Sequence, residues 1–406
     1  MSVGVCIINR NGIALAADSA GTYPGNKMFY NSMNKVFSLS KHHVYGAITY
    51  GNSSLYNISM EQLLNEFRSY LDSQPCLADF FDILDSFKAF IIKKNSYYRF
   101  DIDEVNFCTS LIKDLVVLWG NKIKSIILEE NAVDKINLIL DEFNQNIQSS
   151  IRIDNFDVSQ YIKNTYYQSF ETFVNIVVPE LKLYEKEKDR FWDYVCAFFN
   201  LSLTKETSNA IGLFFAGYGE NDAFPKFIHI ELYTVLGGQL KYKLLEKFDE
   251  SSNSARIQPL AQNDVILTFC KGISNYFLYY IPQKALETIN SKIDSLHTNY
   301  TKEEKELLKL HFFECKQLIS DAITTQVQTN NVDPIINSVR LIPLSEMASL
   351  AENLINITSL RRTYAIDGNQ QTVGGPTDVA VLSKIDGFVW IKRKIYFNKD
   401  LNHTDT

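Results

Sequence analysis

The chain has 406 residues, of which 46% are hydrophobic and 21% charged, so a folded core is expected and wholesale disorder is excluded. Its formal net charge of -7 argues against a general nucleic-acid binder, because a polyanionic partner calls for a basic surface. The six cysteines form no CxxC pair, so free thiols are expected. The chain does not start like a signal peptide, and no run approaches the ~18 apolar residues of a membrane span. A cytoplasmic protein with no membrane contact is therefore expected.

The chain opens with a predicted β-hairpin. Two short apolar runs, 3–8 and 13–17, flank an Asn-Gly turn, which is a strong hairpin signal. A four-residue loop pairs Val3 with Asp18, within one residue of Ser2. Other turn lengths shift this register by a residue or two, so the two ends of the hairpin are expected to be adjacent while the facing of individual side chains stays open.

The remaining elements follow in chain order. Short β-branched runs predict strands at 35–40, 44–50, 210–218, 224–234, 241–247, 264–270, 378–383 and 388–397. Apolar residues at helical spacing predict helices in 63–71 and 80–91, and at 107–119, 134–147, 158–178, 183–199, 276–293, 302–325 and 344–362. The charged run Lys392-Arg393-Lys394 is interpreted as an edge strand guarded by charge.

This order indicates an α+β core with helical insertions. Two sheets covered by helices on both outer faces would satisfy it. The predicted divisions are a first core segment at 1–95, a helical insertion at 96–205, a second core segment at 206–295, a further helical insertion at 296–343, and a closing helix and hairpin at 344–399.

The candidate chemistry lies at the start of the chain. If Met1 is removed, Ser2 offers a hydroxyl nucleophile and its own α-amine, which has a pKa near ~8 and can act as the base. Lys35 would favour the alkoxide form of the hydroxyl, and Asp18 would hold the ammonium in place. Each residue alone has an ordinary interpretation, so the hypothesis rests on the three together.

These residues carry a resemblance to a known family. The sequence is similar to the proteasome β-type and HslV-type peptidases, which are N-terminal nucleophile hydrolases, over about half of the chain. Those proteins begin with threonine, and their acid lies sixteen positions after the nucleophile, as Asp18 does after Ser2. The matching text here is Ser2-Val3-Gly4-Val5, 11–19, Gly25-Asn26, Asn34-Lys35-Val36, 45–53 and Val373-Gly374-Gly375.

The resemblance implies a four-layer αββα sandwich and a hydrolase of peptide or protein substrates that assembles as a ring-like homo-oligomer. It places Ala47 and Tyr50 at the substrate pocket and assigns the oxyanion-stabilising N–H to Thr49. It implies no metal and no cofactor.

Departures from the family leave alternatives open. The family's serine that steadies the N-terminal amine should fall near Cys270-Lys271-Gly272, where no serine stands, and Ser274 or Asp367 could replace its supporting groups. A second hypothesis is therefore a catalytically inactive structural or interaction subunit that docks through its helical block. A third is a small-molecule amide hydrolase, which the size of the pocket near Ala47 would distinguish from a peptidase.

Overall fold

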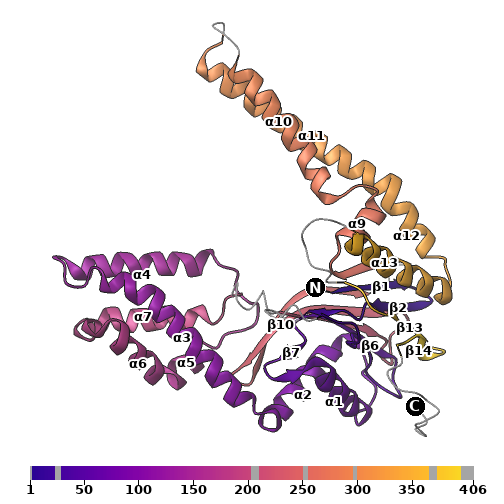
Figure 1. Ribbon diagram of the computed structural model, residues 1–406, viewed down its shortest axis with the longest axis horizontal. Coiled ribbons are helices and arrows are strands. Elements are labelled where there is room, and N and C mark those ends of the chain that lie inside the picture. The colour runs from indigo at the N-terminus through magenta and orange to yellow at the C-terminus, as the bar shows by residue number, and fades with distance from the viewer. Residues whose placement is uncertain are drawn as a thin grey trace.

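The structure is a computed structural model that describes residues 2–22, 29–202, 210–249, 255–295, 300–364 and 373–394. Two five-stranded sheets form its centre, and each described pairing in them is antiparallel (Figure 1). Sheet one has the order β12 (Arg256–Ala261), β1 (Val3–Asn9), β2 (Gly12–Ala17), β13 (Asp378–Ser383), β14 (Gly387–Lys392). Sheet two has the order β11 (Gln239–Asp249), β10 (Lys226–Leu236), β9 (Ile211–Gly217), β6 (Tyr45–Gly51), β5 (Val36–Ser38). The expectation of an α+β chain is confirmed.

Helices cover the two outer faces of the sheets. The inner faces pack on each other through apolar side chains such as Leu15, Ile48 and Phe214. Helices α9 (Asp264–Lys271) and α13 (Leu344–Tyr364) cover sheet one, while α1 (Met60–Asp72) and α2 (Ile83–Tyr98) cover sheet two. The core therefore has four layers, in the order helix, sheet, sheet, helix.

Local sequence explains where helix α1 begins and why the turn between β1 and β2 contains glycine. Helix α1 begins where the Ser59 hydroxyl accepts the Gln62 N–H, and its buried residues recur at helical spacing. In the β1–β2 turn, a Cβ on Gly12 would lie 2.2 Å from the Leu382 carbonyl oxygen, so only glycine fits.

A block of helices between α2 and β9 has its own apolar core. Its elements are α3 (Phe100–Lys124), α4 (Ala132–Ser149), α5 (Ser159–Thr165), α6 (Tyr167–Val177), the 3₁₀ turn η2 (Pro179–Leu183) and α7 (Glu185–Phe198). One continuous helix was expected at 158–178, but the helix breaks at Tyr166, which lies between α5 and α6. Tyr233 and Leu236 of β10 join this core, which ties the block to sheet two.

A helical hairpin projects from the other side of the sandwich (Figure 1). It consists of α10 (Asn275–Asp294) and α11 (Lys302–Val327), followed by η4 (Gln328–Val332) and α12 (Asp333–Val339). Helix α10, which the predicted division at residue 295 assigns to the second core segment, packs mainly on α11. The remaining elements are short: β3 (Gly21–Thr22), β4 (Phe29–Tyr30), β7 (Ser54–Leu55), β8 (Ile58–Ser59) and η1 (Phe80–Asp82).

A second correction concerns the strand beside β1. The apolar run at 264–270 was expected to be a strand, but it is helix α9. The strand that pairs with β1 on the side away from β2 is β12, where no strand was predicted. The residues at 270–272 were expected near Ser2, but the residues found beside the start of β1 are Ala261 and Gln262.

Glu104 fixes the helical block to the sandwich. Its buried carboxylate accepts hydrogen bonds from Tyr161 Oη at 2.6 Å, Tyr166 Oη at 3.1 Å and the Gly237 N–H at 2.9 Å. Replacing Glu104 with alanine should lower the free energy of unfolding in urea by roughly 2–4 kcal/mol, because buried donors lose their acceptor. Glu129→Ala, which removes an exposed ion pair with Lys135, is the control and should cost less than ~1 kcal/mol. Equal losses in the two variants would contradict this role.

Candidate functional site

The β1–β2 hairpin places Asp18 beside Ser2. Ile8 pairs with Ile13, as the turn length predicts, and the Asp18 N–H donates to the Val3 carbonyl oxygen at 3.2 Å. The Val3 N–H donates in return to Oδ1 of Asp18 at 3.0 Å. Because that nitrogen belongs to the peptide bond that follows Ser2, the carboxylate lies next to the candidate nucleophile, which is 8% exposed.

Lys35 forms an ion pair with the same carboxylate. Its Nζ donates to Oδ1 of Asp18 at 2.6 Å, and both side chains are buried. Burial holds the pKa of Lys35 below its usual value, the Asp18 carboxylate opposes that shift, and the charge of Lys394 adds to it. A single oxygen atom therefore joins the Lys35 ammonium to the main chain at the candidate nucleophile.

The second oxygen of Asp18 is also bound. Oδ2 accepts the Ala20 N–H at 3.3 Å and the Gly374 N–H at 3.2 Å. The carboxylate is thus held by donors from β1, from the residue before β5, from the loop after β2 and from the segment before β13. This fixes its orientation toward Lys35.

A second buried ion pair lies on the adjacent strand, and the sequence analysis missed it. Asp378 pairs with Ala17 across β2 and β13, and its carboxylate contacts Lys394 Nζ and accepts the Lys394 N–H at 2.9 Å. Lys394 was expected to be a charge on an exposed edge, but its side chain is only 9% exposed. An isolated Asp or Lys in the sequence gives no signal for such a pairing, which depends on the position of the chain after β14.

The residues expected to form the substrate pocket are engaged elsewhere. The Thr49 N–H donates to the Lys35 carbonyl oxygen at 2.9 Å, so it is not available to an oxyanion in this conformation. Ala47 is completely buried among the side chains between sheet two and α1, including Phe37. The structure therefore places no open pocket at Ala47.

Tyr50 points along the inner face of sheet two. Its ring lies over Gly212, where a Cβ would come within 2.0 Å of it, and its hydroxyl shares a 2.6 Å hydrogen bond with Nε2 of His229. His229 is buried, and this lowers its pKa to about 4. The imidazole is therefore neutral at physiological pH and can bind the Tyr50 hydroxyl without introducing a charge.

The His229 pKa gives a pH-dependent stability. Between the ordinary pKa of about 6.5 and the folded pKa near 4, the unfolded chain binds a proton that the folded chain does not. The contribution of neutral His229 to the free energy of unfolding is complete above pH 6.5 and is lost as the pH falls toward 4. In His229→Gln, the loss of unfolding free energy between pH 7 and pH 4.5 should be smaller than in wild type by roughly 2 kcal/mol. His311→Gln, on the exposed side of α11, is the control, and an unchanged pH dependence in His229→Gln would contradict the assignment.

The residues considered as supports for the N-terminal amine are occupied or lie outside the described chain. Lys271 ends α9 and its Nζ donates to Asn275 Oδ1 at 2.9 Å. Ser274 caps α10 by accepting the Phe277 N–H, and Asp367 falls outside the described residues. The residue beside Ser2 is instead Gln262, whose N–H donates to the Ser2 carbonyl oxygen at 3.2 Å.

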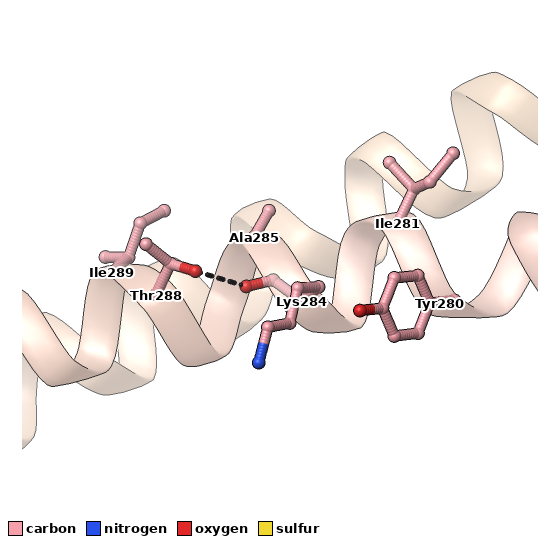
Figure 2. Close-up of a pocket in the computed structure, with 6 residues that line it drawn as sticks. All are labelled: Tyr280, Ile281, Lys284, Ala285, Thr288 and Ile289. Atoms are coloured by element: carbon pink, nitrogen blue, oxygen red, sulfur yellow. Dashed lines mark hydrogen bonds between the residues drawn. The ribbon is translucent and has the colours of Figure 1, made fainter.

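A hollow on α10 is separate from this constellation. Figure 2 shows its lining, which comes from one face of the helix: Tyr280, Ile281, Lys284, Ala285, Thr288 and Ile289. The Thr288 hydroxyl is satisfied by the Lys284 carbonyl oxygen at 2.8 Å. Within the described ranges, no group of three or more His, Cys, Asp or Glu could hold a metal. Among the helices described there, none combines the length and apolarity needed to cross a membrane.

No protein-family model matches the chain, and no curated protein has a matching sequence.

Proposed function

We propose that this protein is a proteasome-like N-terminal nucleophile hydrolase, a peptidase or amidase whose nucleophile is Ser2 after removal of Met1. The observation that carries the proposal is the shared contact at Asp18 Oδ1, which binds Lys35 Nζ at 2.6 Å and the Val3 N–H at 3.0 Å. An acid and an amine converge in this way on the residue that would begin the processed chain. The four layers of the core support the same family.

The reaction needs two acyl-transfer steps. The Ser2 hydroxyl attacks the amide carbonyl while the α-amine takes its proton, and the α-ammonium then protonates the departing amine to leave an ester on Ser2. Water, deprotonated by the same α-amine, hydrolyses the ester and restores the hydroxyl. The Lys35 ammonium stabilises the developing negative charge on Oγ, and Asp18 keeps that ammonium in place.

The oxyanion requires a rearrangement of the observed contacts. For Thr49 to stabilise it, the Thr49 N–H has to exchange its bond to the Lys35 carbonyl oxygen for one to the substrate oxygen. Substrate binding would thus displace the start of β5 from β6. By the same family resemblance, the substrate is a peptide or protein and the functional form is a ring-like homo-oligomer.

The alternative function is a catalytically inactive interaction subunit. It is favoured by the engaged Thr49 N–H, by the absence of an open pocket at the buried Ala47, and by the projecting hairpin. No residue of α11 is buried, and its exposed side chains include the apolar Leu307, Phe313 and Leu318. A partner could cover that surface without any reaction at Ser2.

A comparison of two N-termini tests the proposal. Full-length protein that begins at Ser2 should cleave a peptide amide, whereas the same chain with Met1 retained should be inactive, because its α-amine is no longer on the nucleophilic residue. The measurement is release of a fluorescent amine from a panel of short acyl-peptides. If neither form cleaves any member of the panel, or if both do so equally, the proposal is rejected.

A further inference from the structure

The strand beside β1 ends in an unusual conformation at the site. Ala261, the last residue of β12, pairs with Val3 and has a φ of 60°. A residue with a Cβ rarely adopts this left-handed conformation, and such strain persists only where the surrounding structure imposes it. At this position, it turns the chain out of β12 immediately opposite the start of β1.

The residue after this turn faces Ser2. The Gln262 N–H donates to the Ser2 carbonyl oxygen at 3.2 Å, and helix α9 begins two residues later at Asp264. The N–H and C=O of one strand residue point to the same side of the strand. The Ser2 carbonyl points to Gln262, while both main-chain groups of Val3 point to Asp18. Strand geometry continued one residue before β1 therefore places the Ser2 nitrogen on the β12 side, where Gln262 lies.

We propose that Gln262 is the positioning residue for the Ser2 α-amine, an inference that rests on the proposed function of that amine as the base. Its amide groups bind the amine and direct the nitrogen lone pair toward the Ser2 hydroxyl. An amide suits this role because it forms hydrogen bonds without adding a charge. A carboxylate in its place would stabilise the protonated amine and make it a poorer base at neutral pH.

The test measures the α-amine itself and does not depend on hydrolysis. In full-length protein beginning at Ser2, the rate of reductive methylation of the α-amine is followed against pH by mass spectrometry of the N-terminal peptide. Gln262→Glu should raise the pKa of the α-amine by about one unit. Gln258→Glu is the matched control, since it adds the same charge to the same strand four residues upstream, opposite Cys6, and should leave that pKa unchanged.

A second variant links the position to the reaction. Gln262→Leu should slow acylation of Ser2 by a peptide electrophile at least about tenfold, because the base loses its orientation. If the pKa is the same in Gln262→Glu, Gln258→Glu and wild type, and Gln262→Leu is acylated at the wild-type rate, the positioning role is overturned while the hydrolase proposal stands. If the pKa rises only in Gln262→Glu but no variant is acylated, Gln262 does contact the amine and the hydrolase proposal fails.

Discussion

Replacing Ser2 with alanine is expected to reduce cleavage of a peptide amide at least about 10⁴-fold, because the acyl-enzyme step loses its nucleophile. The fold should survive this change, since the Ser2 main chain keeps its bond from Gln262 and the Val3 N–H keeps its bond to Asp18. The rate of fluorophore release, measured with a matched thermal unfolding curve, separates loss of chemistry from loss of structure.

Two controls define the Ser2 result. Ser2→Thr retains the hydroxyl and the α-amine, so it should retain measurable activity, with a stiffer χ1 because threonine is β-branched. Ser19→Ala removes a buried hydroxyl close to Asp18 that donates to the Pro376 carbonyl oxygen at 2.6 Å. It should lower stability with little effect on the rate per folded molecule. Wild-type turnover in Ser2→Ala would show that the nucleophile lies elsewhere.

Replacing Asp18 with alanine is expected to lower the free energy of unfolding by about 3–5 kcal/mol. The change leaves the Lys35 ammonium buried without its carboxylate and removes the acceptor for the N–H groups of Val3, Ala20 and Gly374. Urea unfolding at pH 7 measures the loss. In the proposed mechanism activity should fall as well, because Lys35 loses the carboxylate that holds its ammonium in place.

A double variant separates charge burial from packing. Asp18→Ala combined with Lys35→Met removes the unpaired buried charge, so it should be more stable than Asp18→Ala alone. Glu142→Ala, which breaks the exposed ion pair with Lys122, is the reference and should change stability by less than ~1 kcal/mol. If Asp18→Ala costs no more than Glu142→Ala, the pair is not buried in solution as the structure has it.

The hairpin and most of the elements could be predicted from local signals. The turn signal at 9–12 predicts the hairpin, and the observed pairing of Ile8 with Ile13 brings Asp18 to the start of the chain. Lys35 immediately precedes β5, and this position lets its Nζ reach the same carboxylate. These relations depend on spacing within about thirty residues, which a sequence displays.

The strand beside β1 could not be recognised in this way. β12 contains Arg256, Gln258 and Pro259, and it is an edge strand, where proline is tolerated and polar side chains reach solvent. The apolar run that follows, Val265-Ile266-Leu267, suits a strand or a short buried helix equally, and periodicity cannot separate the two. As a result, the support of the amine was expected near 270–272, whereas the residue whose N–H reaches the Ser2 carbonyl oxygen is Gln262.

The contacts of the pocket residues were also beyond sequence reasoning. Whether the Thr49 N–H is open depends on how far β5 pairs along β6, and the bond to the Lys35 carbonyl oxygen lies one residue beyond that strand. Likewise, Lys394 lies in a charged run typical of an exposed edge, yet it pairs with Asp378 because the end of β14 lies beside the start of β13. Each case is decided by where the chain runs just beyond the ends of β5 and β14, which local sequence signals do not show.

The most direct measurement is the site of a covalent adduct on the native protein. A peptide epoxyketone can bond to both the hydroxyl and the α-amine of one terminal residue, so it reports the two groups that the proposed reaction requires. After treatment and digestion, the adduct should be found on an N-terminal peptide that begins at Ser2 and should be missing from Ser2→Ala. An unmodified Ser2 peptide, or an adduct on another residue, would contradict the hydrolase assignment.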